Sequence, residues 1–261
     1  MDCPFLFTKK QMPGACEAVI VMNRTHRIVI NRRTGARQAV SETAKSSGFG
    51  GALAISAALL TAALSPAAHA VDWAGNTGSW LDATNWLGGV PTSADDVEIY
   101  GPGTALVSGN GSNAQGHYVS IGRGAPGSLS VTSGGKLSIT KTFVGDIGSS
   151  TVLVDGTNSL LSTGGLVLGT AGQGALTVSN GGTLRTGSIE IGLQPGGQGT
   201  LNLNAGGTVE TGSIYGLVGP NPGATGIFNW SGGTLRVIGS ELVSAMDATL
   251  SGSGSTIDTN G

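Results

Sequence analysis

Residues 174–184 decide the fold, and they read G-A-L-T-V-S-N-G-G-T-L. The same phrase with altered wording starts at Gly127 as G-S-L-S-V-T-S-G-G-K-L and at Gly199 as G-T-L-N-L-N-A-G-G-T-V. A looser copy, G-I-F-N-W-S-G-G-T-L, starts at Gly226, and a degraded one, V-L-V-D-G-T-N-S-L, starts at Val152. The five copies recur with a period of about 25 residues.

A repeat of this length predicts a solenoid, in which each repeat packs only against its neighbours. Within each copy the apolar residues alternate, as Leu176 and Val178 do, and a period of two is that of a β-strand. Each repeat therefore predicts about three short strands. A disordered glycine-rich linker is the alternative, but linkers lack this strict alternation.

Double glycines recur at the same place in the copies and predict one corner of each turn, because a tight corner requires a positive φ. They are Gly134, Gly135, Gly181, Gly182, Gly206, Gly207, Gly232 and Gly233. Polar Thr-Gly-Ser turns at residues 186–188 and 211–213 predict the next corner. The sequence thus predicts an all-β fold, a right-handed parallel β-helix of triangular section with about five to seven rungs spaced about 4.8 Å apart.

Charge is scarce and unevenly divided along the chain. Only 11% of the residues are charged, which favours a surface of Ser, Thr and Asn ladders and argues against a nucleic-acid partner. Residues 1–70 hold eight Lys/Arg and three Asp/Glu, whereas residues 71–261 hold five and twelve. Cys3 and Cys16 lie in the first part, so residues 71–261 contain neither a disulfide nor a cysteine-based metal site.

Residues 49–64 read F-G-G-A-L-A-I-S-A-A-L-L-T-A-A-L and carry no charge. The segment is too short to span a bilayer comfortably, and small residues follow it at Ala68 and Ala70. This pattern predicts a secretory signal peptide that the Sec machinery exports and signal peptidase cleaves after Ala70. A buried core helix, the alternative, leaves the basic flank in front of the segment unexplained.

The basic flank, residues 22–45, reads M-N-R-T-H-R-I-V-I-N-R-R-T-G-A-R-Q-A-V-S-E-T-A-K. It resembles the extended signal peptide region of type V secretion proteins, the autotransporters and two-partner exoproteins of Gram-negative bacteria. The residues that match this pattern are Met22, Asn23, Arg24, Arg27, Asn31, Gly35, Ser41, Glu42 and Lys45. Ile30 departs from it, since the family usually has Trp there. The resemblance implies slowed targeting to the inner membrane and a leader that is helical or disordered.

The resemblance also divides the chain. Residues 1–21 are expected to be a mis-annotated extension, because the targeting pattern begins at Met22. Residues 22–70 form the extended signal peptide, residues 71–126 a cap with the first strands, and residues 127–261 the passenger repeats. The family implies a C-terminal translocator barrel, which is not recognisable before Gly261, so the chain is expected to be a truncated passenger, either a fragment or a frameshifted product.

Three tryptophans, Trp73, Trp80 and Trp86, precede the first rung. A solenoid end exposes an apolar cross-section and unpaired strand edges, so these indoles predict a cap. A sugar-stacking platform is the alternative.

No catalytic, cofactor-binding or metal-binding residue is predicted. His117 is the one histidine after residue 70, and no serine-protease motif surrounds any serine. Asp155, Glu190 and Glu210 occupy different offsets in their repeats, and the basic residues are scattered, so no cluster of charged groups is expected.

The expected protein is therefore a non-enzymatic passenger with a structural or adhesive role. It is exported to the periplasm, and then to the cell surface or medium if a translocator is present. Its mature part does not span the membrane, and its candidate ligand is a host-surface protein or glycan. A carbohydrate-active β-helix enzyme or a glycan-binding module is the alternative.

Overall fold

The computed structural model describes residues 26–30, 37–41, 70–216, 223–239 and 241–259. The chain divides into two compact units, Met1–Leu60 and Thr61–Gly261. In the first unit, β1 (His26–Ile30) pairs antiparallel with β2 (Arg37–Ser41). These ten residues are extended, in contrast to the expected helical or disordered leader. The β-branched run at residues 28–30 favours a strand.

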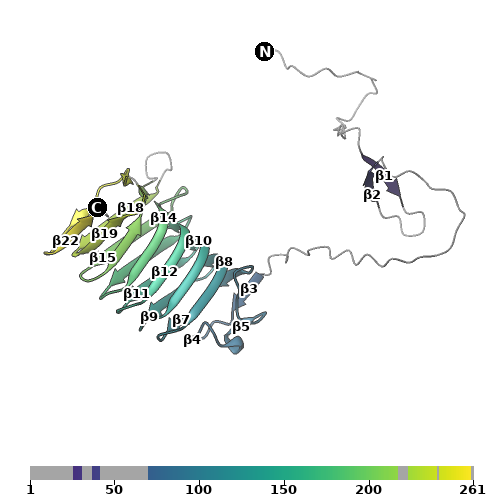
Figure 1. Cartoon of the computed structure of the whole chain (residues 1–261), viewed down its shortest axis with the longest axis horizontal. Helices are drawn as coiled ribbons and strands as arrows, with labels where there is room; N and C mark the ends of the chain where they lie inside the picture. The colour runs from purple at the N-terminus through teal and green to yellow at the C-terminus, as the bar shows by residue number, and fades with distance from the viewer. Residues whose placement is uncertain (1–25, 31–36, 42–69, 217–222, 240, 260–261) are drawn as a thin grey trace, which may run out of the picture. The chain divides into compact units, whose positions relative to one another are not determined.

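The second unit is a parallel coil of strands that form two sheets (Figure 1). The first sheet contains β3 (Ala70–Trp73), β5 (Trp86–Leu87), β6 (Asp96–Ile99), β8 (Asn113–Ile121), β10 (Lys136–Val144), β12 (Leu160–Leu168), β14 (Thr183–Ile191), β16 (Thr208–Thr211), β17 (Ser213–Gly216), β19 (Gly233–Val237), β20 (Val243–Ser244) and β22 (Ser255–Asp258). The second sheet contains β4 (Gly78–Ser79), β7 (Thr104–Ser108), β9 (Gly127–Thr132), β11 (Ser149–Asp155), β13 (Gln173–Ser179), β15 (Gln198–Asn204), β18 (Thr225–Ser231) and β21 (Thr249–Leu250). A short 3-10 helix, η1 (Ala83–Asn85), lies between β4 and β5.

The predicted parallel β-helix is confirmed, and it has about eight turns, where five to seven were predicted. The turns beyond the five copies of the phrase are built on β4 and β7 before the first double glycine, where the first strands were expected, and on β21 after the last. Strand pairing between turns uses backbone N–H and C=O groups, which every residue except proline supplies. Turns can therefore form where the repeat phrase is absent.

The long strands of the first sheet bend in the middle, which gives each turn three inward-facing segments. In β14 the inward residues are Leu184 and Thr186 before the bend, and Ile189 and Ile191 after it. The pairing of β12 with β14 skips Gly187, the residue at which the inward side switches. The predicted polar corner at residues 186–188 thus lies inside a continuous strand, and Thr186 turns inward and donates its hydroxyl to the Ser188 carbonyl at 2.9 Å.

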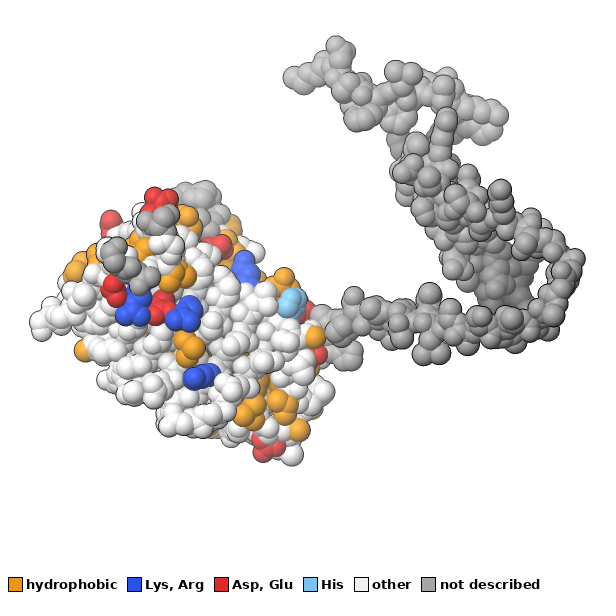
Figure 2. Space-filling view, in the orientation of Figure 1, with side chains coloured by type: hydrophobic (Ala, Val, Ile, Leu, Met, Phe, Trp, Pro, Cys, Tyr) orange, Lys and Arg blue, Asp and Glu red, His pale blue; other side chains and the backbone are white. Residues whose placement is uncertain are grey.

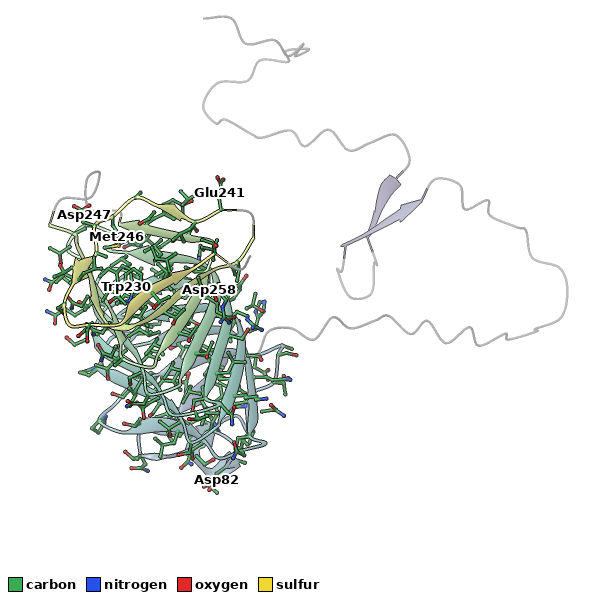
Figure 3. All side chains as sticks on the ribbon, turned by 60° about the vertical axis from the view of Figure 1, so that its left-hand side comes forward. Asp82, Trp230, Glu241, Met246, Asp247 and Asp258 are labelled. Atoms are coloured by element: carbon green, nitrogen blue, oxygen red, sulfur yellow. The ribbon has the colours of Figure 1, made fainter. Side chains whose placement is uncertain are left out.

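Two aliphatic columns run through the core behind the second sheet. One contains Ala105, Leu129, Val152, Leu176, Leu201 and Phe228, and the other contains Val107, Val131, Val154, Val178, Leu203 and Trp230. The degraded copy at Val152 takes its place in register, as the repeat predicts. Near the C-terminal end, Phe228 and Trp230 stack with ring centroids 5.8 Å apart. Figure 3 shows Trp230 between the sheets there, at the end of the body opposite Asp82.

The double glycines lie at turns between the sheets, and in all pairs except Gly232–Gly233, where both φ angles are positive, their two positions serve different needs. The first residue of each pair has a positive φ, for example +87° at Gly181. Asn180 before it also has a positive φ, 51°, and Asn-Gly is the preferred pair for such a turn. At Gly182, an added Cβ would collide with the Val154 carbonyl oxygen of the preceding turn. At this corner, Gly181 is therefore required for its positive φ, and Gly182 is required because a side chain would not fit against the preceding turn.

Candidate functional site

The three tryptophans of the predicted cap are buried together at the first turn. Trp86 meets Trp73 and Trp80 edge to face, with ring centroids 4.7 and 4.8 Å apart. The Trp73 indole N–H donates to the Asn76 carbonyl at 2.8 Å, and the Trp86 N–H donates to the Trp80 carbonyl at 2.6 Å. The three residues are only 0–4% exposed, whereas a sugar platform requires an accessible ring face. This geometry favours the cap.

His117 does not lie in a catalytic arrangement within the described part of the chain. Its Nδ1 lies 2.9 Å from Asp96 Oδ1, and its ring packs 4.0 Å from the Tyr118 ring. Nucleophilic catalysis would need a hydroxyl or thiol hydrogen-bonded to the other ring nitrogen. The neighbouring Asp95 caps a turn, because its Oδ2 accepts from the Thr92 N–H at 2.8 Å.

The three carboxylates considered for hydrolysis lie on different parts of the coil. Asp155 ends β11 in the second sheet, where it accepts hydrogen bonds from the Ser179 hydroxyl at 2.6 Å and the Asn180 amide at 2.7 Å. Glu190 lies after the bend of β14, and Glu210 lies in β16, level with the part of β14 before the bend. The structure does not bring these three groups together.

The structure does assemble a ladder of alternating charge that the sequence reasoning missed. Strand register aligns Arg185, Glu210, Arg236 and Asp258 on four successive turns. Glu210 accepts from Arg185 Nε at 2.5 Å and from an Arg236 Nη at 2.9 Å, and Arg236 Nε donates to Asp258 at 2.8 Å. We call this set the charge ladder. On the face shown in Figure 2, basic side chains gather over the middle and C-terminal turns, with an acidic side chain between two of them.

Burial differs along the charge ladder and explains its electrostatics. The Glu210 side chain is 6% exposed, because the arginine side chains on both sides cover it. Arg185 and Arg236 are 57% and 40% exposed. Hydrogen bonds to Asp258 and then to Glu210 raise the pKa of Arg236, so the guanidinium stays charged at any physiological pH.

The expectation that the basic residues are scattered is therefore wrong for Arg185 and Arg236. A signal for their alignment was present in the sequence. Arg185, Glu210, Arg236 and Asp258 each come four residues after a corner glycine with positive φ: Gly181, Gly206, Gly232 and Gly254. Counting from the corner places all four in one outward column.

Small polar residues form parts of two other outward columns. Thr183, Thr208, Thr234 and Thr256 stack next to the charge ladder. On the second sheet, the Asn229 amide donates to Asn202 at 2.9 Å, and Asn202 donates to Thr177 at 3.3 Å. These columns are stacked polar ladders of the kind that the composition predicted, and large side chains such as Tyr118 and Leu153 interrupt the outer surface elsewhere.

Replacing Glu210 with alanine should lower the free energy of unfolding by about 1–2 kcal/mol, because it removes the carboxylate that both arginines bind. The exposure of the arginines keeps the loss below that of a fully buried ion pair. Glu190→Ala is the matched control, since Glu190 makes no ion pair within the described residues, and its loss should stay within about 0.5 kcal/mol. Urea unfolding measures both, and equal losses would contradict a stabilising ladder.

Among the described residues, no three or more His, Cys, Asp or Glu side chains are grouped so that they could hold a metal ion. A helix with the length and apolar character needed to cross a membrane is likewise not found in that part of the chain.

Much of the predicted leader lies outside the described residues. Of the motif residues, the structure describes only the backbone of Arg27 in β1 and of Ser41 in β2. The apolar segment and Ala68 fall outside, whereas Ala70 is the exposed first residue of β3.

Comparison with known proteins identifies the leader. Residues 22–70 match the family described as Extended Signal Peptide of Type V secretion system. No curated protein and no solved structure matches the chain. The matched range contains all nine motif residues together with Ala68 and Ala70, and the β-helix follows it directly. The chain is therefore a type V secreted protein, with an extended signal peptide that directs Sec export and a β-helix passenger after it.

Proposed function

We propose that the passenger acts at the cell surface or in the medium as a structural or adhesive element, without catalytic machinery of its own. The observation that carries this proposal is the combination of a type V leader with outward columns of stacked small polar residues on the middle and C-terminal turns. A coil of this kind stacks similar polar side chains on successive turns. Such a surface can make many weak contacts with a partner at the same time, and together these contacts give a high avidity.

The positions of the carboxylates support this assignment over a hydrolase. Glycoside hydrolysis uses two carboxyl groups about 5–10 Å apart on opposite sides of one bond. Asp155 lies on the second sheet, and Glu190 is separated from Glu210 by the bend of the first sheet. Both carboxylate oxygens of Glu210 are moreover bound by arginines, Oε2 by Arg185 and Oε1 by Arg236.

The proposal is tested with the exported protein coated on beads. We expect these beads to attach to host cells or extracellular matrix more often than albumin-coated beads. The same protein is incubated with a polysaccharide panel, and new reducing ends or unsaturated products are measured. Cleavage of a polysaccharide that one Asp or Glu substitution abolishes would overturn the proposal in favour of an enzyme.

A further inference from the structure

A groove crosses five successive turns beside the glycine corner. Its volume is about 600 Å³. Its walls come from the corner loops around Asn110, Gly134 and Asn158 and from outward residues of the first sheet. Because successive turns are about 4.8 Å apart, the groove extends for roughly 19 Å along the coil. An elongated channel parallel to the coil axis suits a linear chain molecule better than a compact one.

Two cations line this groove, although the passenger as a whole is acidic. Lys136 and Arg185 both belong to its wall. They lie two turns apart, about 10 Å along the coil axis, and Arg185 is two residues further along its strand than Thr183, the residue level with Lys136. Lys136 is exposed and makes no ion pair within the described residues. Arg185 uses Nε for Glu210, while its Nη groups make no hydrogen bond in the described part of the chain. The negative charge of Glu210 is shared with Arg236, so the groove retains positive charge.

Apart from the apolar Leu160 and the charged Glu210, the remaining lining is neutral and polar. It offers the hydroxyls of Thr157 and Thr183 and the side-chain amides of Asn110 and Asn158, and both asparagines are exposed. Within the described residues these two amides make no side-chain hydrogen bond, so their donors and acceptors are available to a ligand. Hydroxyls and amides of this kind match the hydroxyl groups of a sugar.

The lining also argues against single-stranded nucleic acids as ligands of the groove. No aromatic residue lines the groove, and single-stranded nucleic acids are held by stacking on aromatic rings together with many phosphate contacts. Two cations separated by an uncharged stretch suit a chain of acidic sugars, in which carboxylates on non-adjacent rings contact the cations while the hydroxyls of the rings between them face the groove. We infer that the groove binds an acidic polysaccharide, whose carboxylate or sulfate groups contact Lys136 and Arg185 while its hydroxyls contact the asparagines and threonines. This inference rests on the proposed adhesive function and names its ligand class.

The test uses the exported protein, because the arginines of the leader would themselves bind polyanions. Polygalacturonate is the probe, with neutral dextran and poly-L-glutamate for comparison. We expect binding to polygalacturonate that weakens as salt rises, and at least about tenfold weaker binding for Lys136→Gln, the loss of one charge-assisted contact. Lys141→Gln is the matched control. It removes the same charge from the same strand, but Lys141 lies beyond the bend and outside the groove, over the Phe143 ring at 5.3 Å.

Thr183→Val separates sugar recognition from general attraction to anions, since it removes one hydroxyl and preserves shape and strand propensity. We expect a several-fold loss for polygalacturonate with this variant. Equal losses for Lys136→Gln and Lys141→Gln would overturn the inference, as would poly-L-glutamate binding as tight as that of polygalacturonate. If coated beads attach to host cells but the protein does not bind polygalacturonate, the inference about the groove is overturned, whereas the proposed adhesive function is supported.

Discussion

Replacing Leu176 with aspartate should lower the free energy of unfolding by more than about 4 kcal/mol, enough to prevent stable folding of the passenger. Leu176 is fully buried in β13 and lies in the aliphatic column between Val152 and Leu201. A carboxylate there would lose its hydration, and no cation lies in the column to pair with it. Urea unfolding followed by circular dichroism measures the effect.

The control introduces the same residue one position further, as Thr177→Asp. Thr177 points outward and accepts a hydrogen bond from Asn202, which an aspartate can also accept. This variant should stay within about 1 kcal/mol of the parent protein. Similar losses at both positions would mean that the alternation of residues does not decide which side chains face the core.

Replacing Gly182 with alanine should cost about 2–4 kcal/mol, although its φ is one that alanine can adopt. The reason is steric, because the added methyl group would collide with the Val154 carbonyl oxygen. That oxygen is backbone, and it cannot move without disturbing the pairing of β11 with β13. Thermal or urea unfolding of the variant tests this expectation.

Gly196→Ala provides the matched comparison. Gly196 has a φ of +81°, but an added Cβ would meet nothing within 4 Å. Its cost should therefore be only the left-handed backbone strain of about 1–2 kcal/mol. If Gly196→Ala were the more damaging of the two, then φ alone would explain the glycines, and the close approach of successive turns at Gly182 would be contradicted.

The repeat phrase predicted the core because each of its features has one physical cause. Leu176 and Val178 alternate because a strand turns every second side chain inward, and Gly181 and Gly182 recur because a tight corner needs them. Even the degraded copy at Val152 was placed correctly. It kept its inward valines and a positive-φ glycine, Gly156, which is sufficient for one turn.

The remaining features depend on relations between turns, which a single repeat does not display. The charge ladder forms because Arg185 and Glu210 are neighbours in space at a separation of 25 residues. Asp155 and Glu190 occupy other columns than Glu210, so a comparison among these carboxylates alone does not reveal the charge ladder. The total number of turns was underestimated for a related reason, because backbone pairing leaves no residue signature.

A distance between two spin labels tests the stacked coil most directly. Ser130 and Asn229 lie in one outward column, connected in register through Leu153, Thr177 and Asn202, although they are 99 residues apart in sequence. The exported protein contains no native cysteine after residue 70, so Ser130→Cys and Asn229→Cys can be labelled selectively. Four steps of about 4.8 Å predict a narrow distribution near 20 Å by pulsed electron paramagnetic resonance. A broad distribution centred near 55 Å, as expected of a flexible chain of this length, would contradict the β-helix.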